Sequence, residues 1–339
     1  MTKGTVLVTG ASGYIAGFVI KDLIADGWSV SGTIRDLAKA DAVRAALGLT
    51  ADQLSLTAAD LTRDAGWGDA VAGCDFVQHI ASPLPTGKAK SEDELIVPAR
   101  DGALRVLRAA KAAGVKRVVM TSSVAAMYYG MAGVSRTFTE ADWTDLASPS
   151  TDAYAKSKTI AERAARDWIA AEGGGMEYCS INPGLVLGPV LGSDFSGSLA
   201  VVTRLLDGSL PGLPRIGFTL CDVRDIAAAH VTAMTAPGMA NERFLCSGDF
   251  LWLADVAAIL KSRLGDRAKR VPTRRLPDFL VRLAALFDPE VRLLLPELGR
   301  TRIADASHAR ATIGWNPRPA AESIVDTARS LIAAGLVRR

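Results

Sequence analysis

The sequence predicts a doubly wound α/β fold, in which helices cover both faces of a parallel sheet. Short apolar runs rich in β-branched residues alternate with Ala- and Leu-rich stretches of helical periodicity through the first half of the 339 residues. The first of these runs leads directly into a glycine-rich turn and a helix. A hydrophobic content of 49% is enough for one large core, with room for a smaller lobe.

The predicted strands are short and end in small or polar residues, and they span 6–10, 29–34, 54–60, 75–81, 116–122 and 176–182. Between them, apolar positions at helical spacing predict helices over 99–113 and 153–171. Past residue 182 the pattern loosens into Gly- and Pro-rich loops, followed by helices over 253–264, 278–286 and 322–334.

The loosened second half predicts a smaller lobe that interleaves with the main domain. Residues 221–230 read as a return to the main sheet. We therefore expect residues 1–182, with 219–235, to form a nucleotide-binding domain of the Rossmann type. Residues 183–218 and 236–339 would then form mainly the substrate lobe.

Composition excludes several classes of protein. The net charge is only +3 with 22% charged residues, so no nucleic-acid partner is expected. The amino end lacks a secretory pattern, and no apolar run approaches the roughly 18 residues of a membrane span, so we expect a cytoplasmic protein with no membrane partner. Four scattered cysteines and three scattered histidines predict buried thiols and no metal site. Monomer and homodimer both remain open.

The glycine-rich turn is typical of a dinucleotide site. Gly10 permits a tight turn, Gly13 lets backbone amides approach a pyrophosphate, and Ala16 lets the helix pack closely on the strand. The N–H groups of the helix N-terminus favour an anion. Ser12, Tyr14 and Ile15 complete the predicted contacts of this loop.

The end of the second strand indicates NADP(H) rather than NAD. An NAD enzyme usually places an acidic residue there for the ribose 2′-hydroxyl, whereas this strand ends in Thr33, Ile34 and Arg35, followed by Lys39. A guanidinium and an ammonium suit a 2′-phosphate. A surface ion pair between Arg35 and Asp36 is the alternative interpretation.

Three further residues form a candidate catalytic group. Tyr154 and Lys158 are four residues apart in a predicted helix, so they share one face. An ordinary tyrosine has a pKa of about 10, and we expect the Lys158 ammonium to lower it. Thr121, Ser122 and Ser123 lie at the end of the fifth predicted strand, where ligands of such sheets bind, and a serine there could hold a substrate oxygen.

Together these motifs resemble the extended short-chain dehydrogenase/reductases, in particular the group of dihydroflavonol 4-reductases, cinnamoyl-CoA reductases and related microbial aldehyde and ketone reductases. The resemblance extends over nearly the whole chain and is carried by eight segments: VTGASGYIAG (8–17), TIRD (33–36), AADLT (58–62), HIASP (79–83), VKRVVMTSSVAAM (115–127), YAKSK (154–158), NPGLVLGP (182–189) and IGWNPRP (313–319).

The resemblance implies roles for residues that spacing alone does not single out. Asp60 and Leu61 would border the adenine. The other implied contacts are Ile80, Ala81 and Ser82 with the ribose and nicotinamide, Pro183, Gly184 and Val186 with the carboxamide, and Ser198 with a phosphate. It also points to Ser123 rather than Ser122 as the catalytic serine, and to Thr121 as a cofactor contact.

Two positions depart from the family pattern. Ala16 stands where relatives often have glycine, which is a tolerated change. Ala99 stands where many relatives have an asparagine that supports a water-mediated proton relay, and this puts the relay in doubt.

The expected activity is NADPH-dependent reduction of an aldehyde or ketone to an alcohol, with Tyr154 as the proton donor, Ser123 on the carbonyl oxygen and Lys158 beside the phenol. Two alternatives are an epimerase or dehydratase of a nucleotide sugar and a non-catalytic NADP(H)-sensing protein. The substrate should be a small apolar or aromatic carbonyl compound. Candidate pocket residues are Leu84, Met127, Tyr128, Tyr129, Leu191, Phe195 and the 209–218 loop.

Overall fold

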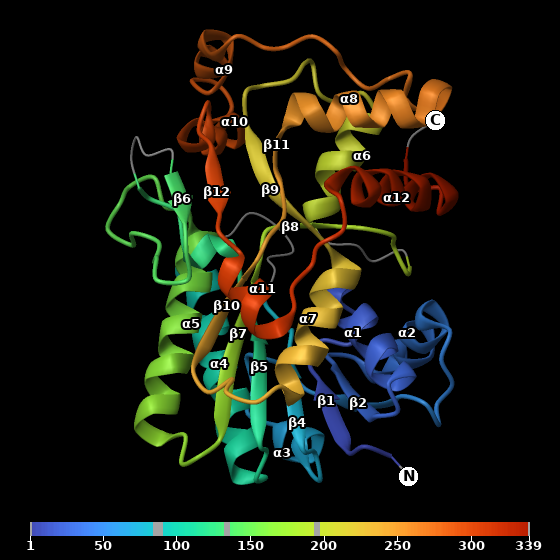
Figure 1. The fold of residues 1–339 in the computed structure, drawn as a ribbon, viewed down its shortest axis with the longest axis vertical. Coiled ribbons are helices and arrows are strands. Elements are labelled where there is room, and N and C mark those ends of the chain that lie inside the picture. Colours follow the sequence, from blue (N-terminus) through green and yellow to red (C-terminus); the bar gives the residue numbers. More distant parts are fainter. Residues whose placement is uncertain (1, 84–90, 132–135, 193–196, 338–339) are drawn as a thin grey trace.

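The structure is a computed structural model that describes residues 2–83, 91–131, 136–192 and 197–337 (Figure 1). Seven parallel strands form its main sheet in the order β10-β7-β5-β4-β1-β2-β3. These strands are β1 (Thr5–Val8), β2 (Ser29–Ile34), β3 (Ser55–Ala58), β4 (Phe76–His79), β5 (Arg117–Thr121), β7 (Glu177–Pro183) and β10 (Glu242–Cys246). The strand order reverses at β1, which lies between β2 and β4, and ligands of such folds bind outside that point.

Successive strand residues pack on opposite faces of the sheet, as the period of two requires. Val6 and Val8 belong to one core cluster, whereas Leu7 between them belongs to another. The first cluster lies under α1 (Tyr14–Ala25), α2 (Ala40–Leu47) and α7 (Val223–Thr235). The second lies under α3 (Trp67–Val71), α4 (Asp93–Ala112) and α5 (Ala153–Glu172). The predicted doubly wound fold is therefore confirmed.

A smaller set of elements lies beyond one end of the main sheet (Figure 1). Strands β8 (Leu185–Leu187), β9 (Gly217–Asp222) and β11 (Phe250–Trp252) form a second sheet, and β6 (Arg136–Phe138) pairs with β12 (Arg302–Ala304). The helices of this part are α6 (Ala200–Leu206), α8 (Leu253–Leu264), α9 (Asp278–Ala284), α10 (Pro289–Leu294), α11 (Ser307–Ile313) and α12 (Ala320–Ala333). Short 3₁₀ turns are η1 (Leu37–Lys39), η2 (Val124–Ala126), η3 (Gly197–Leu199), η4 (Gly265–Ala268) and η5 (Leu295–Glu297).

The chain returns to the main sheet differently from the sequence prediction. Strand β9 belongs to the small sheet with β8 and β11, and only α7 packs against β4, β5 and β7. The returning strand is β10, within the range predicted to be substrate lobe. Arg243, its second residue, makes the segment look exposed in sequence, but the side chain is buried against Glu162, which neutralises its charge. No helix among the described residues is long and apolar enough to cross a membrane.

Candidate active site

The turn after β1 has the geometry that an anion site needs. Gly10 has φ +69°, and a Cβ there would lie 3.1 Å from the backbone of Ala81. Gly13 caps α1 in an extended conformation, no side chain caps the helix, and its first turn contains no acidic residue. The N–H groups of this helix end and the positive end of its dipole therefore remain available to a phosphate.

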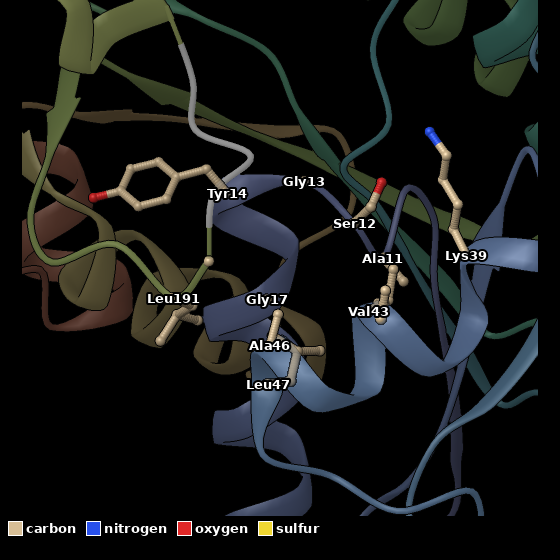
Figure 2. A pocket seen from close by; sticks show the side chains of 12 residues that line it. Ala11, Ser12, Gly13, Tyr14, Gly17, Lys39, Val43, Ala46, Leu47 and Leu191 are labelled. Atoms are coloured by element: carbon tan, nitrogen blue, oxygen red, sulfur yellow. The ribbon is translucent and has the colours of Figure 1, made fainter. Parts of the chain in front are cut away.

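A pocket of about 370 Å³ opens beside this turn (Figure 2). Ser12, Gly13 and Lys39 line it together with residues of α2. The Tyr14 ring extends to the other side of the turn, where its buried hydroxyl has no hydrogen-bond partner among the residues that the structure describes. Thus the structure brings Ser12, Gly13 and Lys39 together, whereas the phenol group of Tyr14 lies apart from them.

Thr9, which the sequence analysis did not single out, joins the ends of β1 and β4. Its hydroxyl accepts the N–H groups of Ile80 and Ala81, both at 3.0 Å, and lies 3.0 Å from Nδ1 of His79. Because both lone pairs of the Thr9 hydroxyl accept from these two N–H groups, its O–H donates a hydrogen bond to Nδ1 of His79. Burial, aided by the charge of Lys158, lowers the pKa of His79 to about 3, so the imidazole is neutral. The segment predicted to border the ribose is thereby held against Gly10.

The charges predicted to select a 2′-phosphate lie on η1 and just before it. No salt bridge joins Arg35 to Asp36, although both residues are described, because the Asp36 carboxylate instead accepts the N–H of Ala38 at 3.0 Å. The pKa of Asp60 is lowered by the N–H of Thr62, with further contributions that include the charge of Arg35. Arg35 and Asp60 therefore lie near each other at one edge of the crevice.

Tyr154 and Ser123 come together although they lie on different elements. Tyr154 is in the first turn of α5, and Ser123 caps η2 directly after β5, where its Oγ accepts the N–H of Ala125 at 3.1 Å. Since that Oγ only accepts from Ala125, its own proton remains available, and it interacts with the phenol of Tyr154. Tyr154 as a residue is 41% exposed, whereas Ser123 is 8% exposed and the phenol oxygen beside it is buried.

The expectation that Lys158 makes the Tyr154 phenol acidic is wrong for this structure. Burial of the hydroxyl raises the pKa of Tyr154 and outweighs the opposing effect of the Ser123 hydrogen bond, and Asp152 adds a smaller rise. The Lys158 Nζ lies 5.9 Å from the centre of the Tyr154 ring, over its face rather than at its oxygen. Desolvation of the phenolate therefore exceeds any stabilisation by the ammonium.

Lys158 itself is buried, with 7% of its surface exposed. Desolvation lowers its pKa to about 8, against an opposing contribution from Glu162. No described residue accepts a hydrogen bond from its ammonium. A buried, poorly satisfied lysine costs stability, and such groups are concentrated at functional sites.

A buried polar network behind the catalytic candidates was missed by sequence reasoning. Glu162 lies one helical turn after Lys158 and is fully buried. It accepts hydrogen bonds from Ser122 at 2.5 Å, Asn182 at 2.8 Å and Arg243 at 2.6 Å. Asn182 also donates to the carbonyl oxygen of Ser123 at 3.2 Å. The network joins α5 to β5, β7 and β10, and the spacing of Glu162 from Lys158 was the available signal.

The remaining predicted contacts lie at the same sheet edge with different surroundings. A Cβ at Gly184 would lie 2.4 Å from the Thr219 carbonyl oxygen, so only glycine fits there. Pro183 and Val186 are buried, whereas Leu61 and Ser198 are partly exposed. Ser82 and Ile15 are also partly exposed.

Thr121 differs from its predicted role, because its hydroxyl lies 2.9 Å from Nε2 of buried His230. On the other side of that ring, Nδ1 lies 2.8 Å from the oxygen of Gln78. This bonding pins α7 to β4 and β5 and uses the hydroxyl in the core. A contact of Thr121 with the cofactor is therefore not supported by the placement of its side chain.

The predicted substrate-pocket residues do not form one group. Met127, Tyr128 and Tyr129 belong to or pack on a small core cluster with Phe138. Leu191 lines the pocket beside the glycine-rich turn instead. The 209–218 loop contributes Leu213 to Arg215 to a separate pocket of about 480 Å³. Leu84 and Phe195 lie outside the described residues.

Ala99, the position where many relatives have the asparagine of the proton relay, is a buried residue of α4.

Comparison with known proteins places this fold and site in a class. The model of the NAD dependent epimerase/dehydratase family matches residues 6–246. The chain therefore belongs to this family, the extended short-chain dehydrogenase/reductases, and the resemblance seen in the sequence is confirmed.

Similar proteins within the family include several reductases. Cinnamoyl-CoA reductase 1 of Arabidopsis thaliana is 36% identical over 278 residues, covering 80% of this chain and 76% of that protein. Anthocyanidin reductase of Vitis vinifera is 30% identical over 310 residues, covering 86% and 87%. Yeast methylglyoxal/isovaleraldehyde reductase Gre2, solved with NADPH, has a TM-score of 0.83 at 25% identity over 98% of this chain and 100% of that chain.

Proposed function

We propose that this protein is an NADPH-dependent reductase that converts an aldehyde or ketone to an alcohol. The observation that carries the proposal is the meeting of Tyr154 with Ser123, above buried Lys158, at the carboxyl edge of β5. The reductase relatives and the NADPH-bound neighbour support the same activity.

The residues present fit an NADP(H) molecule. The uncapped α1 N-terminus beside Gly10 and Gly13 would hold the pyrophosphate, and Arg35 and Lys39 would hold the 2′-phosphate. Gly184, which has no room for a Cβ, would lie against the carboxamide. Bound NADPH would supply a hydride to the carbonyl carbon. In this assignment residues 1–182, with α7 and β10, form the cofactor domain, and most of the remaining chain forms the substrate lobe.

The side chains then provide the proton and hold the oxygen. Because its pKa is raised, Tyr154 is protonated at neutral pH, which is the form that can donate to the developing alkoxide. The Ser123 hydroxyl donates a hydrogen bond to the same oxygen and stabilises the charge that develops there. Lys158, with a pKa of about 8, carries a positive charge at neutral pH and adds to that stabilisation.

The proposal is tested by following NADPH absorbance with a panel of aromatic and aliphatic aldehydes, ketones, diketones and flavanones. Steady oxidation is expected with at least one apolar carbonyl compound, whereas a nucleotide-sugar epimerase would return its cofactor unchanged. Tyr154→Phe should lower kcat at least about 100-fold and leave NADPH binding nearly intact. Tyr178→Phe is the matched control, since within the described part of the chain that buried hydroxyl donates its hydrogen bond to the Met120 sulfur at 3.4 Å, away from the catalytic candidates. Wild-type turnover in Tyr154→Phe would refute the assignment.

The cofactor preference has its own test. The double variant Arg35→Ser, Lys39→Ser removes both charges proposed for the 2′-phosphate. We expect its KM for NADPH to rise at least about tenfold while its KM for NADH changes little, since only the former carries the phosphate. An equal effect on both cofactors would contradict this selection.

A further inference from the structure

Helix α9 packs on the lobe with its small side chains and leaves its large apolar side chains in solvent. Val281 and Ala285, four residues apart, are 4% and 2% exposed. A tighter turn follows α9 directly, because the N–H of Leu286 bonds the carbonyl of Leu283 at 3.1 Å and that of Phe287 bonds the carbonyl of Ala284 at 3.0 Å. A surface helix normally does the reverse and buries its larger apolar side chains.

Four large apolar side chains of α9 and the turn after it form an exposed surface, here called the α9 face: Phe279, Leu283, Leu286 and Phe287, which are 67%, 53%, 66% and 82% exposed. Phe279 and Leu283 lie one turn apart on one side of α9, and Leu286 and Phe287 follow in the turn. Single exposed apolar residues need no explanation, but a contiguous group of this kind marks an interaction site.

The chain around the α9 face is strongly basic. Residues 261–287 contain eight Lys or Arg and two Asp, a net charge of +6, whereas the whole chain carries only +3. Arg274, Arg275 and Arg282 are exposed and make no ion pair with any residue that the structure describes. The Asp278 carboxylate is occupied by Arg215 at 2.7 Å. Figure 1 shows α9 and the chain that enters it from α8 at the end of the molecule opposite α3.

The positive charge around the α9 face distinguishes between the partners that could bind there. In a twofold dimer through this face, each basic segment would lie against its own copy, and the like charges would oppose association. An anionic lipid surface has the complementary charge and an apolar interior for phenylalanine and leucine side chains. Basic residues beside a helix face of Phe and Leu are the composition of helices that lie in a bilayer interface.

We propose that the α9 face, with the arginines that flank it, docks this protein on an anionic lipid surface. The apolar side chains enter the headgroup region, and Arg274, Arg275 and Arg282 contact lipid phosphates and carboxylates. The sequence expectation of no membrane partner rested on the lack of a spanning run, which a surface-bound helix does not need. The proposal does not depend on the reaction that the protein catalyses.

Sedimentation of the full-length protein with vesicles tests the proposal. Vesicles of phosphatidylcholine with phosphatidylserine should bind the protein at low salt, and vesicles of phosphatidylcholine alone should bind it far less. Each basic residue near an anionic surface strengthens binding about fivefold, so Arg274→Glu with Arg275→Glu should weaken it about 25-fold or more. Phe279→Ser with Phe287→Ser should also release the protein, because it removes the inserted side chains.

Matched controls separate the α9 face from general effects. Arg310→Glu with Arg329→Glu makes the same charge change at exposed positions elsewhere, and Val97→Ser with Ile303→Ser removes two other exposed apolar side chains. Both pairs should bind vesicles like the wild type, and all variants should keep wild-type thermal unfolding.

Three results would overturn the proposal: no binding to the anionic vesicles, binding unchanged in the α9-face variants, or equal losses in the control pairs. Sedimentation without lipid can give a fourth result that would overturn the proposal. If the wild type self-associates and Phe279→Ser with Phe287→Ser abolishes that association, the face is a contact between copies instead.

Discussion

Replacing Lys158 by methionine should stabilise the protein at neutral pH while abolishing its proposed activity. Lys158 is 7% exposed, and burial lowers its pKa from 10.5 to about 8. A pKa difference of that size corresponds to about 3 kcal/mol by which the charged folded state is destabilised. Methionine has a similar length and no charge, so it removes this cost.

The pH dependence distinguishes desolvation from improved packing. The folded protein binds the Lys158 proton more weakly than the unfolded chain does, so the cost is fully present below about pH 8. It disappears as the pH rises from there toward the ordinary lysine value of 10.5. The stability advantage of Lys158→Met should therefore be largest near pH 7 and fall by about 3 kcal/mol across that window.

The assay is urea unfolding of the cofactor-free protein at several pH values, with Lys156→Met as the control. Lys156 is on the same helix but pairs with Glu92 at 2.8 Å near the surface. Its replacement should change stability by less than about 1 kcal/mol, with little pH dependence over the same window. If Lys158→Met is less stable than the wild type at pH 7, or its advantage does not change with pH, the reasoning from desolvation is refuted.

Three other predictions follow from the site. The reverse reaction, alcohol oxidation, needs the Tyr154 phenolate, which is scarce at neutral pH because the pKa of Tyr154 is raised. The kcat of alcohol oxidation, measured in steady-state assays, should therefore be low at neutral pH and rise about tenfold per pH unit below that pKa. A flat pH profile would contradict this. Glu162→Gln breaks a fully buried ion pair and should cost about 3 kcal/mol or more in urea unfolding. The control Glu92→Gln, at an exposed pair, should cost less than about 1 kcal/mol, and equal losses would count against the network. Gly184→Ala should cost about 1–3 kcal/mol, measured as a lower Tm, because its Cβ would lie 2.4 Å from the Thr219 carbonyl oxygen; an unchanged Tm would show that the backbone can move.

The strands were predictable because their signal is local. A strand buried on both faces reads as a short apolar run, and β5, whose five residues are all buried, lies within the predicted range 116–122. Strand β10 was missed because it opens with the charged pair Glu242 and Arg243, and the partner that neutralises Arg243 is 81 residues away. A charged residue in a sequence therefore indicates an exposed segment only when no distant residue forms a buried ion pair with it.

The candidate site was partly predictable for the same reason. Tyr154 and Lys158 are one helical turn apart, so their shared face follows from helix geometry alone. The hydrogen bonds of Thr9 to the end of β4, and those that join Glu162 to β5, β7 and β10, connect elements that are distant in sequence. No spacing rule predicts which distant residues will meet. Thr121 had the right position at its strand end, but its hydroxyl bonds to His230 of α7.

By itself, the sequence determined the alternation of strands and helices in the first half, the glycine-rich turn and the shared helix face of Tyr154 and Lys158, because periodicity and short spacings specify these. Tertiary structure decided what surrounds each group. It determined that burial raises the pKa of Tyr154 instead of a neighbouring charge lowering it, and that Val281 and Ala285 are buried while Phe279 and Phe287 face solvent. Desolvation and exposure depend on packing between distant segments, which no local pattern records.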